Sequence, residues 1–257
     1  MNLIPVQLYY EESGTGFPVI FLHGFPFDHT IWEPLVPLMT DKARLIFPDL
    51  RGLGRSPVPD GNYSMRLLAE DVLNLMNTLK IETAILVGHS MGGYASLAFA
   101  QAYPHRLAGL GLVCTQAGAD APERRQARYQ LAEDVRRKGV KVVAENMAPR
   151  VTNNPEQVKP LQKLIMQNKP KGVIASLKAM AERPDALGWL STISIPAVVV
   201  AGAADAFVPL ERARTMAQLL GKAWIVELPG VGHMPMIDAP QATADALNQL
   251  IQMVIAG

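Results

Sequence analysis

The five residues from Gly88 to Gly92, with Ser90 at their centre, form a Gly-x-Ser-x-Gly motif. The motif follows an apolar run at 84–87 and precedes a stretch of small residues at 93–100. A strand, a sharp turn and a helix in this order hold a serine hydroxyl above a sheet, where it can attack a carbonyl carbon. The residues two before and two after the serine come close together in such a turn, so both must be small. The pattern predicts that Ser90 is the nucleophile of an acyl-transfer reaction.

A serine hydroxyl needs a neighbouring base, and that base needs a carboxylate to orient it. His233 is the favoured base, because it lies in a glycine-rich loop directly after the apolar run at 224–228. That position would return it to the sheet edge at which Ser90 stands. Asp205 is the favoured acid, because it follows the apolar run at 197–202 and gives the chain order Ser, Asp, His. The expected catalytic residues are therefore Ser90, Asp205 and His233.

The other histidines and aspartates fit these roles less well. His89 adjoins Ser90 in a tight turn, so the two side chains should point apart. His23 precedes a glycine turn, where we expect it to hydrogen-bond loop backbone. Asp238 follows His233 and would break the chain order. The remaining candidates lie at helix ends or in a helical segment, where a solvated side chain is the ordinary outcome: His29, His105, Asp120, Asp134 and Asp185.

The oxyanion of a tetrahedral intermediate requires about two backbone N–H donors. Met91, the residue after the nucleophile, would supply one donor. Phe25, in the loop that follows the apolar run at 19–22, would supply the other. Both roles use the main chain and leave side chains free to line an apolar acyl pocket. Trp32 and Met234 are also candidates for this pocket, although each of these side chains is equally ordinary in a core.

Short apolar runs alternate with amphipathic segments along most of the chain. This pattern indicates an α/β fold with a mostly parallel sheet and helices on both faces. The expected strands are 19–22, 45–47, 84–87, 107–113, 197–201 and 224–228, and the expected helices are 31–39, 64–79, 92–102, 210–220 and 240–255. Residues 6–10 with the turn at 13–16 are expected to add an antiparallel hairpin at one edge.

One long stretch interrupts this alternation. Residues 116–190 contain no convincing strand, and their helical segments are punctuated by prolines. We therefore expect residues 116–190 to be a helical cap insertion, and residues 1–115 and 191–257 to form the core. Ligands of open α/β sheets bind at the carboxyl ends of the strands. An insertion that leaves from this edge can cover the nucleophile and carry the choice of substrate.

The motifs together resemble those of the α/β-hydrolase fold family. They are His23-Gly24-Phe25, the Asp-x-Arg-Gly-x-Gly-x-Ser segment at 49–56, the serine motif at 88–92, the segment at 202–209 and Gly232-His233. They are similar above all to small cap-bearing bacterial carboxylesterases, with the enol-lactonase and cofactor-free perhydrolase branches close behind. The resemblance implies that Asp49 and Arg51 shape a loop near the site. It also implies that no cofactor is needed.

Bulk composition narrows the function classes. The 24 basic and 23 acidic side chains give a formal net charge of +1, which argues against nucleic-acid and acidic-membrane partners. The single cysteine, Cys114, excludes an intrachain disulfide and a cysteine-based metal site, and we expect no metal. The first residues lack the features of a signal peptide, and no apolar run reaches the length of a membrane span. We therefore expect a cytoplasmic protein.

The sequence predicts a serine hydrolase that cleaves carboxylic esters, with short acyl groups favoured, through an acyl-enzyme on Ser90. Related chemistry on the same residues stays open, because the motifs do not distinguish ester hydrolysis from it. The alternatives are a lactonase of the 3-oxoadipate enol-lactone type, a perhydrolase and a carbon–carbon bond hydrolase. A ligand receptor that retains the three residues is a further alternative from another class. The expected partner is a small-molecule ester, and the oligomeric state is left open.

Overall fold

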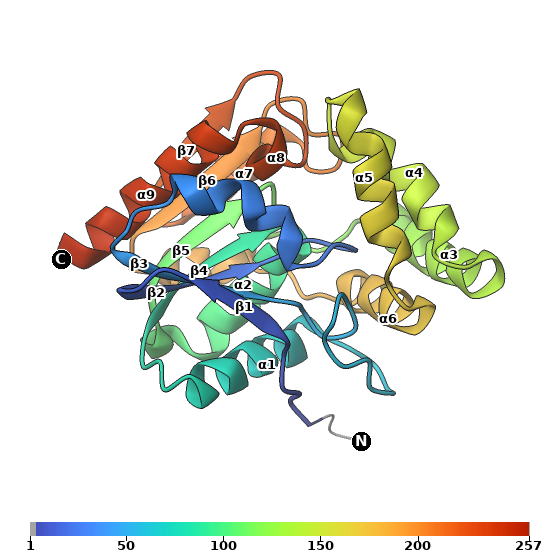
Figure 1. Ribbon diagram of the computed structural model, residues 1–257, viewed down its shortest axis with the longest axis horizontal. Coiled ribbons are helices and arrows are strands. Elements are labelled where there is room, and N and C mark those ends of the chain that lie inside the picture. The colour runs from blue at the N-terminus through green and yellow to red at the C-terminus, as the bar shows by residue number, and fades with distance from the viewer. Residues whose placement is uncertain (1–3, 257) are drawn as a thin grey trace.

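A computed structural model describes residues 4–256 and shows one twisted sheet between layers of helices (Figure 1). Within these residues, seven strands lie in the order β1-β3-β2-β4-β5-β6-β7. Their bounds are Tyr10–Ser13 for β1, Phe17–Leu22 for β2, Ala43–Pro48 for β3, Ala84–His89 for β4, Leu107–Val113 for β5, Ala197–Gly202 for β6 and Ala223–Leu228 for β7. All neighbouring pairs are parallel except β1 with β3. The six predicted strands and the α/β class are confirmed.

The N-terminal edge differs from the predicted hairpin. Strand β1 pairs with β3, with Tyr10 opposite Pro48, and β3 lies between β1 and β2. The turn before β2 packs against the start of β3, where a Cβ on Gly16 would come within 2.1 Å of the Lys42 carbonyl oxygen. The Phe17 N–H donates to that same oxygen at 2.9 Å. The turn therefore carries the chain across β3, which separates the two strands that a hairpin would have joined.

Helices cover both faces of the sheet. Helix α1 (Met65–Thr78) packs against α2 (Met91–Ala102) on one face, and α9 (Pro240–Ala256) packs on the other beside the segment His29–Leu38 (Figure 1). The Ser64 side chain caps α1 by accepting a hydrogen bond from the Leu67 N–H at 3.1 Å. The shorter helices are α7 (Leu210–Leu219) and α8 (Pro235–Asp238), with 3-10 turns at Pro104–Arg106 and Leu187–Thr192. This packing buries β2, β4 and β6 in the core.

The helix predicted at 31–39 is a 3-10 segment over His29–Leu38. Two prolines inside it, Pro34 and Pro37, lack the N–H that an α-helical ladder requires. The Asp28 side chain caps the segment by accepting from the Thr30 N–H at 3.0 Å. Local chemistry therefore changes the type of helix here while its position stays as predicted.

The described stretch between β5 and β6 contains four helices and no strand. They are α3 (Pro122–Lys138), α4 (Lys141–Val151), α5 (Pro155–Met166) and α6 (Pro170–Ala181). Prolines at the first turn start three of them, which suits a residue without a backbone N–H. Helix α3 packs against α6 and α4 against α5, and the group stands beside one end of the sheet (Figure 1).

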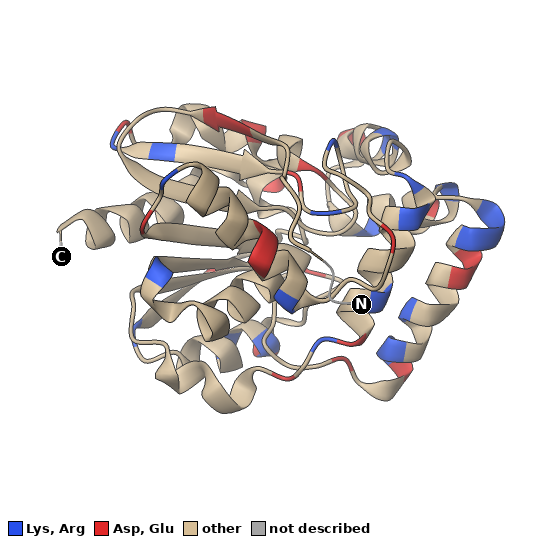
Figure 2. Ribbon diagram, turned by 90° about the horizontal axis from the view of Figure 1, so that it is seen from below, with Lys and Arg blue, Asp and Glu red and all other residues tan. Residues whose placement is uncertain are grey.

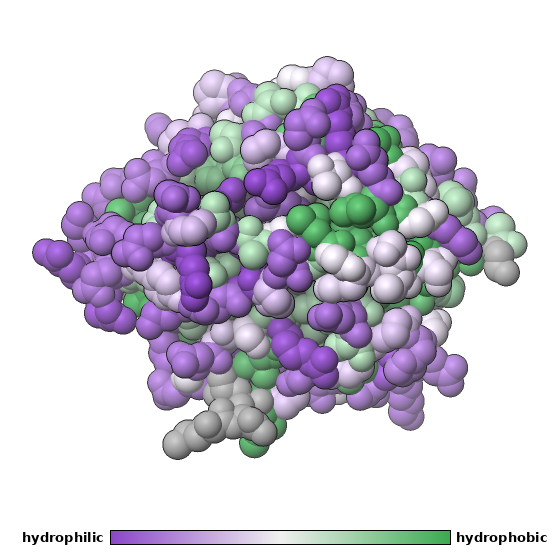
Figure 3. All heavy atoms as spheres, turned by 180° about the vertical axis from the view of Figure 1, so that it is seen from behind, coloured by the Kyte–Doolittle hydropathy of each residue, from purple (hydrophilic) through white to green (hydrophobic). Residues whose placement is uncertain are grey.

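Acidic and basic residues are interspersed on the surface of these four helices and of the core (Figure 2). On the face opposite to that of Figure 1, hydrophilic side chains surround an apolar patch (Figure 3). Among the helices described, none combines the length and the hydropathy needed to cross a lipid bilayer.

Candidate active site

Ser90 occupies a strained turn between β4 and α2. Its φ of 50° and ψ of −111° lie in a region that non-glycine residues rarely adopt. A Cβ on Gly88 would lie 2.5 Å from the Gly92 carbonyl oxygen, and one on Gly92 would lie 2.1 Å from the Leu22 carbonyl oxygen. The turn thus requires small residues at both flanking positions, as the sequence predicts. Such strain persists where the surrounding structure holds it, and it is typical of functional turns.

His233 and Asp205 meet at the carboxyl end of the sheet. The His233 Nδ1 and the Asp205 Oδ2 are 2.7 Å apart, and both side chains are almost completely buried. The other oxygen of Asp205, Oδ1, accepts from the backbone N–H groups of Phe207 at 2.7 Å and Val208 at 3.1 Å. Burial alone would raise the pKa of Asp205, but the charge and hydrogen bond of His233 outweigh it and lower this pKa. Asp205 is therefore held as a carboxylate that faces the imidazole.

Ser90 and His233 line the same cavity, which has a volume of about 410 Å³. No hydrogen bond joins their side chains within the described chain, a loose geometry that is common in enzymes without substrate. The core contributes Phe25, Ala206 and Phe207 to the lining. The insertion helices and α2 contribute the rest: Tyr94, Arg124, Ala127, Arg128, Leu131, Asn146, Met147, Arg150, Leu177 and Met180. The volume suits a small-molecule ligand.

The two predicted oxyanion donors lie beside Ser90. Met91 is the first residue of α2, so its N–H has no acceptor within the helix. Phe25 follows β2 and lines the cavity with Ser90. Its N–H makes no hydrogen bond to another atom of the described chain. A Cβ on the intervening Gly24 would lie 3.2 Å from the Ser90 Cβ, so this loop runs directly against the nucleophile turn. Both N–H groups are free to bind an oxyanion.

Two predicted pocket residues lie elsewhere. Trp32 and Met234 are completely buried, and neither lines the cavity. Trp32 packs edge-on against Phe21 at 5.2 Å and against His89 at 6.3 Å between ring centroids. Both side chains therefore serve the core beneath the site. The sequence could not distinguish these outcomes, because an apolar side chain near a site satisfies either role.

The two histidines of the surrounding loops hold backbone in place. His23 Nε2 accepts from the Leu50 N–H at 2.8 Å, and its Nδ1 lies 3.0 Å from the Gly24 carbonyl oxygen. This contact with loop backbone is the one predicted for His23. Burial lowers its pKa, which keeps the ring neutral and consistent with one donor and one acceptor nitrogen. His89 Nε2 lies 2.8 Å from the His233 carbonyl oxygen, a contact that the sequence did not reveal.

Asp49 and Arg51 are structural, as the sequence resemblance implies. Asp49 accepts hydrogen bonds from the backbone N–H groups of His29 at 2.8 Å and Arg55 at 2.7 Å, which fixes the loop after β3. Arg51 forms a two-pronged ion pair with Asp71 at 2.6 and 2.7 Å, and both side chains are fully buried. Neither lines the cavity with Ser90.

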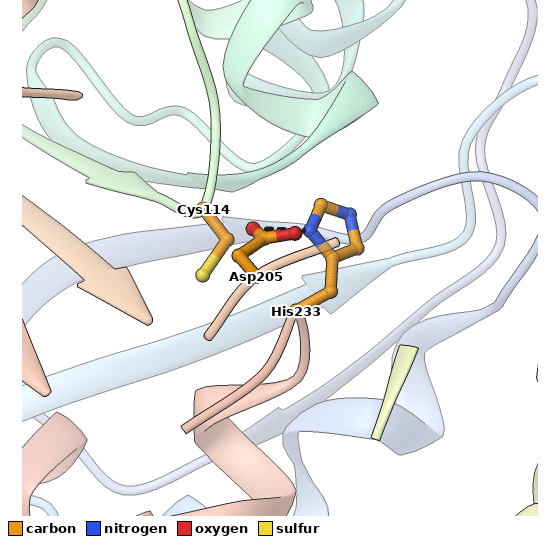
Figure 4. Close-up of side chains that lie close together, drawn as sticks. All are labelled: Cys114, Asp205 and His233. Carbon is orange, nitrogen blue, oxygen red and sulfur yellow. Dashed lines mark hydrogen bonds and ion pairs between the residues drawn. The ribbon is translucent and has the colours of Figure 1, made fainter. Parts of the chain in front are cut away.

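Cys114 lies beside the pair formed by Asp205 and His233 (Figure 4). Its thiol is 2% exposed, and burial together with the charge of Asp205 raises its pKa, so it remains a protonated thiol. The donor atoms of these three residues lie within 4.8 Å of one another, a spacing that a metal ion could use. However, the carboxylate already accepts hydrogen bonds from His233, Phe207 and Val208. The set is better explained as a hydrogen-bonded pair with a buried neighbour.

The insertion also touches the histidine loop directly. The His233 N–H donates to the carbonyl oxygen of Val151, the last residue of α4, at 2.9 Å. Next to it, the Asn153 amide donates to the Gly230 carbonyl oxygen at 2.7 Å. Sequence reasoning missed these contacts and the cavity residues Phe207, Arg124 and Arg150. The last three carry a weak signal at most, since each lies in a segment without a motif.

A family model for the alpha/beta hydrolase fold matches residues 18–240. Since this match spans most of the chain, the protein belongs to the α/β-hydrolase fold family. The sheet order and the strand–turn–helix that holds Ser90 agree with this assignment.

Within the family, the chain is similar to bacterial esterases and enol-lactonases, as predicted. A thermophilic esterase from Thermogutta terrifontis, solved with malate bound, matches with a TM-score of 0.92 and 39% identity, covering 96% of this chain and 93% of that one. The enol-lactonase from Burkholderia xenovorans matches with a TM-score of 0.86 and 26% identity, covering 97% and 96%. By sequence, the 3-oxoadipate enol-lactonase 2 of Acinetobacter baylyi is 28% identical over 91% of this chain and 88% of its own length.

Proposed function

We propose that this hydrolase cleaves carboxylic esters of small molecules through an acyl-enzyme on Ser90. The observation that carries the proposal is the shared cavity of Ser90 and His233, with Asp205 hydrogen-bonded to the far side of the imidazole at 2.7 Å. Nucleophile, base and orienting acid are the three groups that acyl transfer to water requires. The similarity to the Thermogutta terrifontis esterase supports the same reaction class.

In the first half-reaction, Ser90 Oγ attacks the ester carbonyl carbon while His233 Nε2 takes the hydroxyl proton. The negative oxygen of the tetrahedral intermediate receives hydrogen bonds from the N–H groups of Phe25 and Met91. His233 then gives its proton to the departing alcohol oxygen, and the acyl group stays on Ser90. In the second half-reaction, a water molecule repeats the sequence and releases the carboxylic acid. Asp205 stabilises the imidazolium in both halves.

We infer that residues 116–190 act as a cap that selects the substrate. The side chains of α3, α4 and α6 that line the cavity support this role, because they enclose the space above Ser90. The contact of the His233 N–H with the Val151 carbonyl oxygen couples the same helices to the base. A cavity of about 410 Å³ favours short acyl groups over long lipid chains.

The test is hydrolysis of 4-nitrophenyl acetate and butyrate by wild type and by Ser90→Ala. We expect Ser90→Ala to lose at least about a thousandfold in kcat/KM. The matched control is Ser96→Ala, on the same helix but outside the cavity lining, which should keep wild-type activity. A fluorophosphonate should add its mass to the peptide that contains Ser90 in wild type only. Turnover that survives in folded Ser90→Ala would rule out the proposal.

Lactone hydrolysis is a second candidate, favoured by the match to two enol-lactonases. It uses the same steps, except that the leaving oxygen stays tethered to the acyl group. Assays of wild type and Ser90→Ala on dihydrocoumarin beside 4-nitrophenyl acetate distinguish the two. A kcat/KM for the lactone that exceeds the ester value would favour the lactonase.

A further inference from the structure

The cavity that holds Ser90 is strongly basic. Among the described residues that line it, Arg124, Arg128 and Arg150 carry positive charge, and no aspartate or glutamate is present. Arg124 and Arg128 come from α3 and Arg150 from α4, within the insertion whose charged residues are coloured in Figure 2. A neutral ester with short chains does not require such a lining.

The charges of this lining are incompletely balanced. The buried carboxylate of Asp120 lies 2.8 Å from Arg183 and 3.5 Å from Arg124, and it also pairs with Arg128. One carboxylate thus serves three guanidinium groups, so two positive charges lack a counter-ion in the described chain. Burial lowers the pKa of Arg124, as expected for a cation that is partly desolvated without full compensation. An anion bound beside it would offset this cost.

Arg150 is the least engaged of the cavity arginines. It makes no hydrogen bond and no ion pair with any described residue. Its guanidinium carbon lies 4.7 Å from the centre of the Phe207 ring, a cation–π contact that leaves its N–H groups open. Its donors therefore remain available to a ligand.

Phe207 places these cations on one side of the site. Its ring centre lies 5.1 Å from that of His233, and its carbonyl oxygen accepts from Arg124 Nη1 at 2.8 Å. One aromatic ring therefore separates the Arg150 guanidinium from the imidazole. In the proposed mechanism the imidazole gives its proton to the alcohol oxygen, so the neighbours of His233 flank the alcohol portion of the ester.

We propose that Arg124 and Arg150 form a carboxylate-binding subsite on the alcohol side of the cavity, and that preferred substrates are esters whose alcohol portion carries a carboxylate. This inference rests on the proposed function. A guanidinium presents paired N–H donors that match a carboxylate, and such pairs are stronger than neutral hydrogen bonds. The alcohol product would be a hydroxy acid.

The test compares two esters that share an acyl group and differ only in charge on the alcohol side. These are 3-acetoxybenzoate and 3-acetoxybenzamide, with each kcat/KM divided by the rate of hydroxide-catalysed hydrolysis of the same ester. We expect wild type to prefer the carboxylate by about tenfold or more at low ionic strength. Added salt should reduce the preference, because the subsite is partly exposed to solvent.

Variants of the two arginines locate the preference. Arg150→Gln and Arg124→Gln should bring the ratio of the two normalised kcat/KM values close to one, and Arg150→Lys should retain part of it. The control is Arg137→Gln, because Arg137 is exposed on α3 and does not line the cavity. It should keep both the ratio and the rates of wild type.

Equal normalised values in wild type, or a preference that both Gln variants retain, would overturn the subsite. Placement on the alcohol side has its own test, in which 4-nitrophenyl hemisuccinate competes with 4-nitrophenyl succinamate. A larger preference for this acyl-side carboxylate would overturn that placement. If 3-acetoxybenzamide is hydrolysed through Ser90 without any carboxylate preference, only the subsite fails. If neither acetate ester is hydrolysed through Ser90, the proposed function fails as well.

Discussion

The imidazole of His89 hydrogen-bonds the carbonyl oxygen of His233, with 2.8 Å between Nε2 and the oxygen. The two rings also pack at 4.8 Å between their centres. Burial and the nearby charge of His233 lower the pKa of His89 to about 3, so the ring is neutral at ordinary pH and Nε2 carries the donated proton. The residue that precedes Ser90 thus fixes the backbone of the proposed base. His89 is a positioning residue in this arrangement.

Replacing His89 should weaken both catalysis and folding. His89→Ala leaves the His233 carbonyl oxygen buried without its donor, so the free energy of unfolding should fall by about 1–3 kcal/mol. The same change should lower kcat for 4-nitrophenyl acetate by about tenfold, because a small displacement of the base weakens proton transfer. His89→Gln, which can offer an amide donor, should recover part of both losses.

Two measurements separate positioning from a purely structural role. The acidic limb of the pH profile of kcat/KM should not move in His89→Ala, because a group with a pKa of about 3 does not titrate there. Stability lost with wild-type kcat would contradict the positioning role and leave only a structural one.

Asp205→Asn should trap His233 in the wrong tautomer. The N–H groups of Phe207 and Val208 both donate to Oδ1 of Asp205, so the amide oxygen of an asparagine would occupy that position. The NH₂ group would then face His233 Nδ1, which must become an acceptor and leave the proton on Nε2. An imidazole with a proton on Nε2 cannot accept one from Ser90. We expect kcat/KM to fall by about a thousandfold or more, with the fold intact.

The matched control is Asp238→Asn, because Asp238 is the aspartate that follows His233 in the chain. Its carboxylate accepts from the Thr152 hydroxyl at 2.5 Å and does not contact the imidazole. This variant should keep most of the activity. Nitrogen-15 NMR of the imidazole should show the tautomer change in Asp205→Asn alone, and an unchanged spectrum there would contradict the argument.

The pair of His29 and Asp49 should make stability depend on pH. Burial opposes a charge on His29, but the hydrogen bond and the charge of Asp49, whose Oδ1 lies 2.7 Å from Nδ1, raise its pKa. A raised pKa in the folded state means that this stabilisation is complete below the unfolded value of about 6.5. It is lost as the pH rises through the folded value. The advantage of wild type over His29→Asn in the free energy of unfolding should therefore shrink between pH 6 and pH 9.

Urea unfolding of both proteins across this range measures the difference directly. His105→Asn, which alters an exposed histidine, is the control and should follow wild type. A constant difference between wild type and His29→Asn would show that the ion pair contributes nothing to the pH dependence.

The positions of Ser90, Asp205 and His233 could be predicted because each follows a readable apolar strand. Carboxyl ends of parallel strands meet at one sheet edge, so residues far apart in the chain converge by topology alone. The pairing of β1 with β3 was not readable, since it depends on a turn that packs across β3. Local pattern also cannot decide whether Trp32 faces a cavity or the core, because both environments accept an indole.

The insertion was the least readable region, for a physical reason. Its arginines become informative only through partners distant in sequence, such as the Phe207 carbonyl oxygen bound by Arg124. A run of basic residues on an amphipathic helix ordinarily lies in solvent. The separation of Arg124, which lines the cavity, from Arg125, which pairs with Glu182 on the surface, depends on how α3 packs against α6.

Asn168 joins the insertion to the core through one buried amide. Its oxygen accepts from the Gly54 N–H at 2.9 Å, and its nitrogen donates to the Pro26 carbonyl oxygen at 2.8 Å. Asn168→Ala leaves both backbone groups without partners, so the free energy of unfolding should fall by about 1–3 kcal/mol. Because Pro26 follows Phe25, the proposed oxyanion donor, kcat/KM for 4-nitrophenyl acetate should fall severalfold as well.

Asn168→Asp tests the direction of these two bonds. It keeps an acceptor for the Gly54 N–H but sets a carboxylate oxygen against the Pro26 carbonyl oxygen, so it should not restore activity. The control is Asn77→Ala, which removes an exposed hydrogen bond to Arg106 of 3.0 Å and should cost far less stability. Urea unfolding and ester kinetics on the four proteins measure both effects. Wild-type kcat/KM in Asn168→Ala would mean that the loop of Phe25 holds its position without the insertion.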